Sequence, residues 1–154
     1  MPGVDAKTND PYTTGQVQGR RDWPHVQLEA RFVAVLKDHR EGRGLNLIRP
    51  ATRAIRKNEI HEFILTDEPD AGPGRQVNRV SYVAFAEFRN GGMLVEGDQV
   101  CVNGKVIGEI AGFDETHMPN HQNVVIRGPK RLTGRELGAK LGDTISFIPV
   151  YTKG

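Results

Sequence analysis

The sequence lacks the features that disulfides, membrane spans and secretion need. Cys101 is the single cysteine of the 154 residues, so no disulfide can form within the chain. No apolar stretch approaches the roughly 20 residues of a membrane-spanning helix, and residues 1–10 lack the apolar core of a secretory signal. These absences predict a soluble protein of the reducing cytoplasm with no membrane partner. Cys101 stands between two valines, which predicts a buried structural thiol rather than a nucleophile.

A strong excess of one charge is also absent. Lysine and arginine total 21 and aspartate and glutamate total 19, which leaves a formal net charge of +2. Nucleic-acid binding draws much of its affinity from many neutralised phosphates. The basic stretch from Lys37 to Lys57 also lacks the aromatic side chains on which single-stranded bases stack. We therefore expect no nucleic-acid partner, and any anion binding must be local to one site.

Several motifs that identify enzyme classes are missing. The chain has no G-x-S-x-G, no G-x-x-x-x-G-K-[ST], no G-x-G-x-x-G and no H-E-x-x-H. The pair His61-Glu62 continues as Phe-Ile-Leu, without the second histidine of a zinc helix. The sequence therefore gives no motif evidence for a hydrolase with a nucleophile elbow, a nucleotide kinase or a dinucleotide-dependent enzyme.

Turn residues and short apolar segments are abundant, with 18 glycines and 9 prolines. Thr133 is suited to cap a helix and Glu136 follows three residues later, so one short helix is predicted over 133–141. Strands are predicted where alternating or continuous apolar residues lie between turn signals: from Val26, over Glu62–Thr66 and Arg79–Phe88, on both sides of Asn103-Gly104, over Asn123–Arg127 and over Thr144–Val150.

The fold prediction is all-β. We expect residues 25–154 to form a single domain, a small closed or partly open Greek-key-like barrel with one short helix. Residues 1–24 show neither helical nor strand period and predict a flexible N-terminal arm. Two Gly-Asp steps, Gly97-Asp98 and Gly142-Asp143, each precede an alternating strand. They resemble the Gly-Asp boxes of cradle-loop and Greek-key barrels, in which the carboxylate accepts backbone N–H bonds.

The best candidate site is the segment D-E-T-H-M-P-N-H-Q-N, residues 114–123, called the histidine loop below. Pro119 makes a helix improbable, so we expect a loop between strands. Three interpretations remain open. The polar residues Asp114, Asn120 and Asn123 can cap a tight turn. Asp114, His117 and His121 can hold a divalent metal ion as a cofactor. The two histidines, with Asp114, can instead transfer protons to a bound substrate as catalytic residues.

A second candidate is a cluster of basic residues between Lys37 and Lys57. Arginine matches carboxylate and phosphate groups with two parallel hydrogen bonds, so this cluster favours a small anionic ligand. A solvated face with local ion pairs is the competing interpretation. The predicted substrate-binding residues, which include two amides of the histidine loop, are His39, Arg40, Arg49, Arg53, Arg56, His61, Asn120 and Asn123.

The stretch E-G-D-Q-V-C-V-N-G-K-V-I-G-E-I-A-G-F-D, followed by P-N-H-Q-N-V-V-I-R-G, carries a family resemblance. It resembles the C-terminal half of the glucitol/sorbitol-specific phosphotransferase IIA barrel, which implies a barrel fold. The phosphoryl-accepting histidine of that family lies in its N-terminal half, and neither His39 nor His61 stands in a matching motif. No site residue is therefore carried over. The overall pattern is also similar to uncharacterised bacterial proteins.

Two functional hypotheses follow. The first is an enzyme or auxiliary protein of bacterial metabolism that holds an anionic metabolite near the histidine loop and catalyses an isomerisation, dehydration or hydrolysis. The second is a non-catalytic ligand-binding or interaction barrel, assembled as a homo-oligomer through the N-terminal arm.

Overall fold

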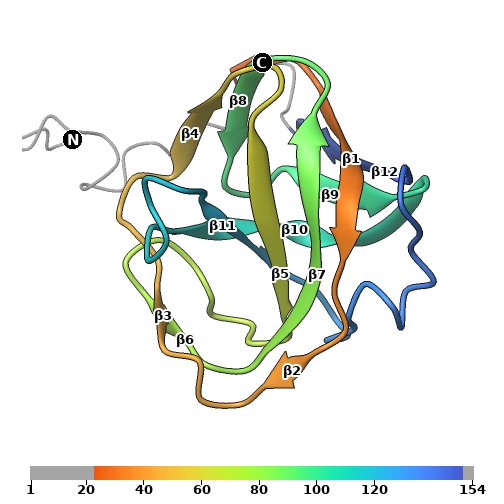
Figure 1. Cartoon of the computed structure of the whole chain (residues 1–154). Helices are drawn as coiled ribbons and strands as arrows, with labels where there is room; N and C mark the ends of the chain where they lie inside the picture. Colours follow the sequence, from red (N-terminus) through yellow and green to blue (C-terminus); the bar gives the residue numbers. More distant parts are fainter. Residues whose placement is uncertain (1–22, 151–154) are drawn as a thin grey trace, which may run out of the picture.

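A computed structural model describes residues 23–150, and all regular structure in that range is β. The all-β prediction is confirmed, and Figure 1 shows the arrangement. The strands are β1 (Leu28–Val35), β2 (His39–Arg40), β3 (Leu45–Asn46), β4 (Thr52–Ile55), β5 (Ile60–Thr66), β6 (Gln76–Val77), β7 (Val80–Phe88), β8 (Gly92–Val95), β9 (Gln99–Val102), β10 (Lys105–Asp114), β11 (Asn123–Arg127) and β12 (Thr144–Ile148).

Seven of these strands pair in a ring. The order is β1-β12-β9-β10-β11-β5-β7, and β7 also pairs with β1, so the hydrogen-bonded pairing returns to its starting strand. β5 and β11 run parallel, and the other neighbours in the ring run antiparallel. Figure 1 shows β5, β7 and β1 side by side. Two short ribbons, β3-β6 and β4-β8, lie outside the ring order.

The main hydrophobic core draws side chains from all seven strands of the ring. In β1, Leu28 and Phe32 are buried and alternate with exposed residues, as a strand with one face inward requires. Phe63 of β5 stacks on Phe147 of β12 with ring centroids 5.5 Å apart, and Phe88 of β7 lies 5.6 Å from the same ring. These rings tie strands from distant parts of the chain together.

A smaller core lies on the outer side of the ring. Leu45 and Val77, from the β3-β6 ribbon, are buried in one cluster with Ile64 of β5 and Val125 of β11. Successive residues of a strand point to opposite faces, and Phe63 of β5 belongs to the main core. β5 is therefore buried on both faces from His61 to Thr66, although His61, Glu62 and Thr66 are polar or charged.

The tightest turns match the sequence prediction. Asn103 and Gly104 join β9 to β10 with φ of 50° and 82°, the positive values that a type I′ hairpin turn needs. Gly97-Asp98 and Gly142-Asp143 form equivalent hydrogen bonds. Gly97 N–H donates to Ile110 O and Ile110 N–H to Asp98 O, at 2.8 and 2.9 Å. Gly142-Asp143 makes the same exchange with Phe32, both bonds at 2.9 Å.

The predicted helix over 133–141 is wrong. Thr133 and Glu136 do form the predicted reciprocal cap, with N···O distances of 3.0 and 2.9 Å. The segment nevertheless makes a single turn, because Gly138 adopts φ of 76° and ends it. Gly134 also packs on β7, where an added Cβ would lie 2.0 Å from Val83 O. The turn is thus fixed on the sheet instead of extending as a helix.

The predicted N-terminal arm, residues 1–24, falls outside the described residues except for Trp23 and Pro24. The ring of Trp23 lies 5.2 Å from that of His25, and His25 Nε2 contacts the buried carboxylate of Asp98 at 2.8 Å. The end of the predicted arm therefore packs beside the first Gly-Asp step. The described part of the chain contains no helix long and apolar enough to cross a membrane.

Candidate functional site

Asp114 closes the base of the histidine loop. Its carboxylate is buried and accepts hydrogen bonds from Asn46 N–H (3.0 Å), Thr116 N–H (2.9 Å) and Asn123 Nδ2 (3.1 Å). Burial alone would raise the pKa of Asp114, but the hydrogen bonds from these three residues outweigh it and lower the pKa. Asp114 and Asn123 thus act as turn-capping residues, and both carboxylate oxygens already face donors.

The two histidines of the loop lie beside each other. Residues 116–120 form a run of turns in which the N–H groups of Asn120 and His121 approach the carbonyl of His117 at 2.8 and 3.4 Å. The rings of His117 and His121 are 5.1 Å apart and inclined at 30°. His117 is exposed, whereas the side chain of His121 is 11% exposed. The turn therefore produces the pairing of imidazoles that a four-residue spacing gives in a helix.

Glu62, which the sequence analysis did not select, is the carboxylate that faces His121. Their Nε2 and Oε1 atoms are 3.2 Å apart, and both side chains are 11% exposed. The edge of His121 also packs on Phe85, with ring centroids 4.9 Å apart. The signal in the sequence was a charged residue in the apolar strand β5. The pairing with His121 could not be predicted from the sequence, because 59 residues separate the two side chains along the chain.

The contacts of His121 assign a role to each ring nitrogen. Nε2 faces the Glu62 carboxylate, and Nδ1 lies 3.2 Å from the amide nitrogen of Asn120. A neutral ring therefore carries its proton on Nε2 and its lone pair on Nδ1. Asn120 is exposed, so a ligand can take its place at Nδ1. An imidazole oriented by a carboxylate in this way is suited to accept and return a proton.

Arg43 extends this cluster toward solvent. Its Nε donates to the hydroxyl of Tyr82 at 3.0 Å, and its Nη2 lies 3.5 Å from His117 Nε2. Arg43 belongs to the basic cluster but not to the predicted binding set. Gly42 and Gly44 flank it, and an arginine between two glycines in a predicted loop is the signal that could have identified it. We call Arg43, Tyr82, His117 and His121 the histidine-loop face.

His61 and Arg53, both predicted as substrate-binding residues, lie next to this face. His61 Nε2 contacts Glu59 at 2.6 Å, and His61 Nδ1 accepts the Gln122 N–H at 2.9 Å. Burial lowers the pKa of His61, and the charges of Arg53 and His121 lower it further. Arg53 Nε is buried and has no hydrogen-bond partner among the described residues.

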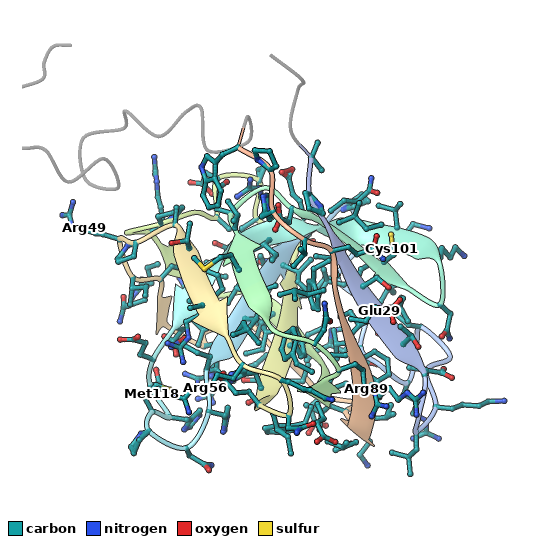
Figure 2. The ribbon with its side chains drawn as sticks, turned by 90° about the horizontal axis from the view of Figure 1, so that it is seen from above. Glu29, Arg49, Arg56, Arg89, Cys101 and Met118 are labelled. Atoms are coloured by element: carbon teal, nitrogen blue, oxygen red, sulfur yellow. The ribbon has the colours of Figure 1, made fainter. Side chains whose placement is uncertain are left out.

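Of the remaining predicted binding residues, Arg56 lies near the end of the histidine loop, because its N–H donates to Glu59 at 2.9 Å and Glu59 also contacts His61. His39 pairs with Glu136 at 2.8 Å on the exposed surface. Arg40, Arg49 and Arg56 are exposed, and Figure 2 shows Arg49 and Arg56 well apart. The structure therefore separates Arg49 from Arg56, and the binding of an anionic ligand by some of these arginines stays a prediction.

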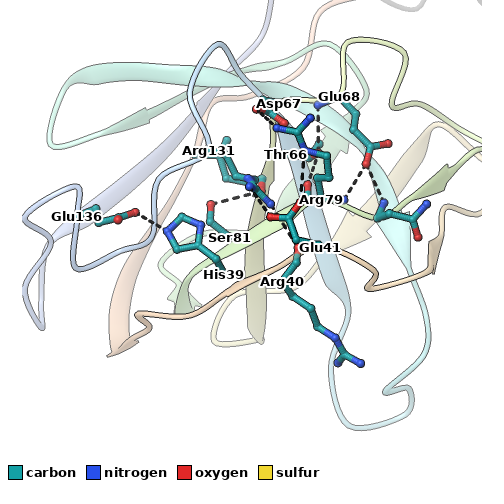
Figure 3. A network of polar contacts seen from close by, with 12 residues as sticks. His39, Arg40, Glu41, Thr66, Asp67, Glu68, Arg79, Ser81, Arg131 and Glu136 are labelled. Atoms are coloured by element: carbon teal, nitrogen blue, oxygen red, sulfur yellow. Dashed lines mark hydrogen bonds and ion pairs between the residues drawn. The ribbon is translucent and has the colours of Figure 1, made fainter.

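An ion-paired surface does lie beside β2, but its arginines, Arg79 and Arg131, come from outside the basic cluster, which contributes Glu41 and the carbonyl of Arg40 to it. Figure 3 shows the network, in which Arg131 contacts Glu41 at 2.7 Å and Arg79 contacts Asp67 at 3.1 Å. Arg131 also hydrogen-bonds the carbonyl of Arg40, whose own side chain points away from the network in Figure 3. Such exposed pairs contribute little to stability.

The metal hypothesis has little geometric support. Among residues 23–150, no three or more side chains of the metal-binding types His, Cys, Asp and Glu are arranged to hold an ion. The carboxylate of Asp114 already accepts three capping hydrogen bonds, and the two histidine rings pair with each other.

Cys101 is buried, and burial raises the pKa of its thiol. That raised pKa fits the structural role predicted for it.

A hollow of about 650 Å³ lies elsewhere on the molecule. Its lining includes Asp67, Glu109 and Arg127 and the exposed Val106, and it includes no residue of the histidine loop. Arg127 is paired there with Glu109 at 3.1 Å. We place the candidate site at the histidine loop despite this hollow, because the paired imidazoles and the His121–Glu62 contact are there.

Comparison with known proteins supplies a family but no activity. No curated protein and no solved structure matches the chain significantly. The resemblance to the phosphotransferase IIA barrel therefore finds no support. A family model does match residues 22–148, nearly the whole described range. The chain thus belongs to DUF6917, a family of unknown function.

Proposed function

We propose that this protein binds a small anionic metabolite at the histidine-loop face and exchanges a proton with it through His121. We also infer that the ring of seven paired strands is the small barrel predicted from the sequence, with the histidine loop on its outer side. Loops on a rigid β scaffold commonly carry binding and catalytic residues. The compartment we propose is the cytoplasm.

Charge and donor geometry support an anionic ligand. Arg43 donates its Nε–H to the hydroxyl of Tyr82, and its terminal nitrogen Nη2 lies near His117. A guanidinium presents these nitrogens as a planar fork that fits carboxylate or phosphate oxygens. Two imidazoles 5.1 Å apart add further N–H donors when protonated. Arg53, whose Nε has no hydrogen-bond partner within residues 23–150, adds positive charge near His61.

The single observation that carries the proposal is the His121–Glu62 contact at 3.2 Å. Both side chains are largely buried, and an ion pair screened from water is stronger than an exposed one. Glu62 therefore stabilises the imidazolium that forms when His121 takes a proton at Nδ1. Proton abstraction followed by return of the proton is the chemistry of isomerisation and dehydration, and proton transfer from water serves hydrolysis.

A second candidate is non-catalytic recognition of a ligand, and the exposure of the loop favours it. Residues 115–120 are all exposed, so this part of the site is an open surface, whereas enzymes usually exclude water from reacting groups. Glu62→Gln separates the candidates. In the enzyme it abolishes turnover while ligand affinity changes little, whereas a binding protein has no turnover to lose. Homo-oligomer formation belongs to this second candidate.

We expect a panel of anionic metabolites, carboxylates and sugar phosphates, to contain a ligand that raises the melting temperature. Arg43→Ala should weaken its binding at least about tenfold, because a hydrogen bond to a charged group contributes about 1.5 kcal/mol or more. Isothermal titration calorimetry measures the affinity. Arg49→Ala is the matched control, since Arg49 is exposed and lies outside the face. Equal losses in the two variants would remove Arg43 from the site.

A further inference from the structure

We infer that His61 is a positioning residue: its neutral imidazole holds the end of the histidine loop, and its protonation releases His121 from Glu62. This inference rests on the proposed function, because it describes the regulation of the same face. We therefore expect the histidine-loop face to bind its ligand at neutral pH and to lose this ability at acidic pH. It also gives His61, predicted as a ligand-binding residue, a role that acts through the loop.

The geometry allows His61 one protonation state. Its Nδ1 accepts the Gln122 N–H at 2.9 Å, so this nitrogen must carry a lone pair. Its Nε2 lies 2.6 Å from a carboxylate oxygen of Glu59, so this nitrogen carries the hydrogen. The side chain of His61 is 6% exposed, and water has little access to replace either partner. A second proton on this ring can therefore reside only on Nδ1.

That second proton would face a donor. With hydrogen on Nδ1, the ring and the Gln122 N–H would point hydrogens at each other, and the bond would become a repulsion. A buried backbone N–H without an acceptor costs free energy, so the backbone at Gln122 must move. Gln122 directly follows His121, and its carbonyl accepts the Glu62 N–H at 3.0 Å. One displacement therefore disturbs both members of the His121–Glu62 pair.

The groups around His61 shift its pKa in opposite directions. Burial, the charge of Arg53 and the charge of His121 all lower its pKa, and the hydrogen bond and charge of Glu59 raise it. The net pKa is lowered. Phe88 supplies an apolar wall, with its ring centroid 6.1 Å from that of the imidazole. The neutral ring is thus the form that the folded protein selects.

His61→Asn is the decisive variant. The amide oxygen of asparagine can take the place of Nδ1 and accept the Gln122 N–H, but it does not titrate. We expect the Gln122 amide resonance of the wild type to shift as the pH falls from about 8 to about 4. We also expect its protection against exchange, measured relative to an unfolded chain at the same pH, to fall. In His61→Asn the amide should remain unchanged. His61→Leu, which has no acceptor, should show the released state at every pH.

Ligand affinity supplies the functional readout. Below the pKa of His61, the ratio of wild-type to His61→Asn affinity for the anionic ligand should fall by up to about tenfold per pH unit. Taking the ratio removes the effects of pH on binding that do not involve His61. The inference is overturned if the Gln122 amide resonance of the wild type does not depend on pH, or if it shifts identically in His61→Asn. The amide measurement needs no ligand, so failure of the proposed function alone leaves that result intact.

Stability should follow the same titration. Because the pKa of His61 is lowered in the folded state, the unfolded chain binds more protons below the ordinary histidine value of about 6.5. The wild type should therefore lose stability relative to His61→Asn as the pH falls below about 6.5, and the difference should be constant above it. Urea unfolding at several pH values measures this difference. A wild type that instead gains stability relative to His61→Asn as the pH falls below about 6.5 contradicts the assignment of a neutral ring.

Discussion

Asp114→Ala is expected to lower the free energy of unfolding by about 4 kcal/mol. The change removes the acceptor of three hydrogen bonds, one from the buried Asn123 amide and two partly buried ones from Asn46 and Thr116. A buried donor left unsatisfied costs about 1 to 3 kcal/mol. Urea denaturation monitored by tryptophan fluorescence gives the value. The contribution should be present above the ordinary aspartate pKa and disappear as the pH falls through the lowered pKa of Asp114.

The control for Asp114 is an aspartate on the surface. Asp70 is exposed and pairs loosely with Arg75 at 3.7 Å, so Asp70→Ala should change stability by no more than about 0.5 kcal/mol. A loss of less than about 1 kcal/mol for Asp114→Ala would mean that its hydrogen bonds do not hold the loop. The carboxylate would then be available for the metal or catalytic role that the sequence first suggested.

Phe63→Ala is expected to destabilise the fold by about 4 kcal/mol, because large-to-small changes of buried aromatic residues lose burial and leave a cavity. Phe63 is fully buried, stacks on Phe147 at 5.5 Å and lies 6.0 Å from Phe88. Its loss therefore weakens packing between β5, β7 and β12 at once. Chemical denaturation with wild type and variant at one protein concentration measures the effect.

Phe85 provides the matched aromatic control for Phe63. It lies on β7, is partly exposed and contacts His121 at 4.9 Å. Phe85→Ala should cost only about 1 kcal/mol, yet it should alter the NMR resonances of His121. If the two phenylalanine variants lost equal stability, the division between an inner core and an outer functional face would be incorrect.

Local sequence signals predicted most of the long strands. Alternation placed β1, and Asn103-Gly104 placed the turn between β9 and β10. The short strands β2, β3, β4 and β6 were missed, because two to four residues carry no readable period. The helix over 133–141 failed for a different reason. Its cap formed as predicted, but Gly138 ended the segment after one turn.

The sequence identified only part of the candidate site, and the reason lies in the order of the strands in the sheet. The sequence identified His117 and His121, and it assigned Asp114 as their carboxylate because Asp114 is near them in the chain. The parallel pairing of β5 with β11 instead places Glu62 opposite Asn123, the residue at the end of the histidine loop. A parallel pair needs a long connection, so local sequence spacing cannot reveal it.

The central claim is that the histidine-loop face binds a small anion. The most direct measurement is a titration of the isotopically labelled protein with the best stabilising anion, followed by two-dimensional amide NMR. We predict saturable shifts at Arg43, Tyr82 and the residues of 116–122 other than Pro119, which has no amide hydrogen. Saturable shifts confined to the hollow around Asp67 and Arg127, or no saturable shift with any anion of the panel, would contradict the account.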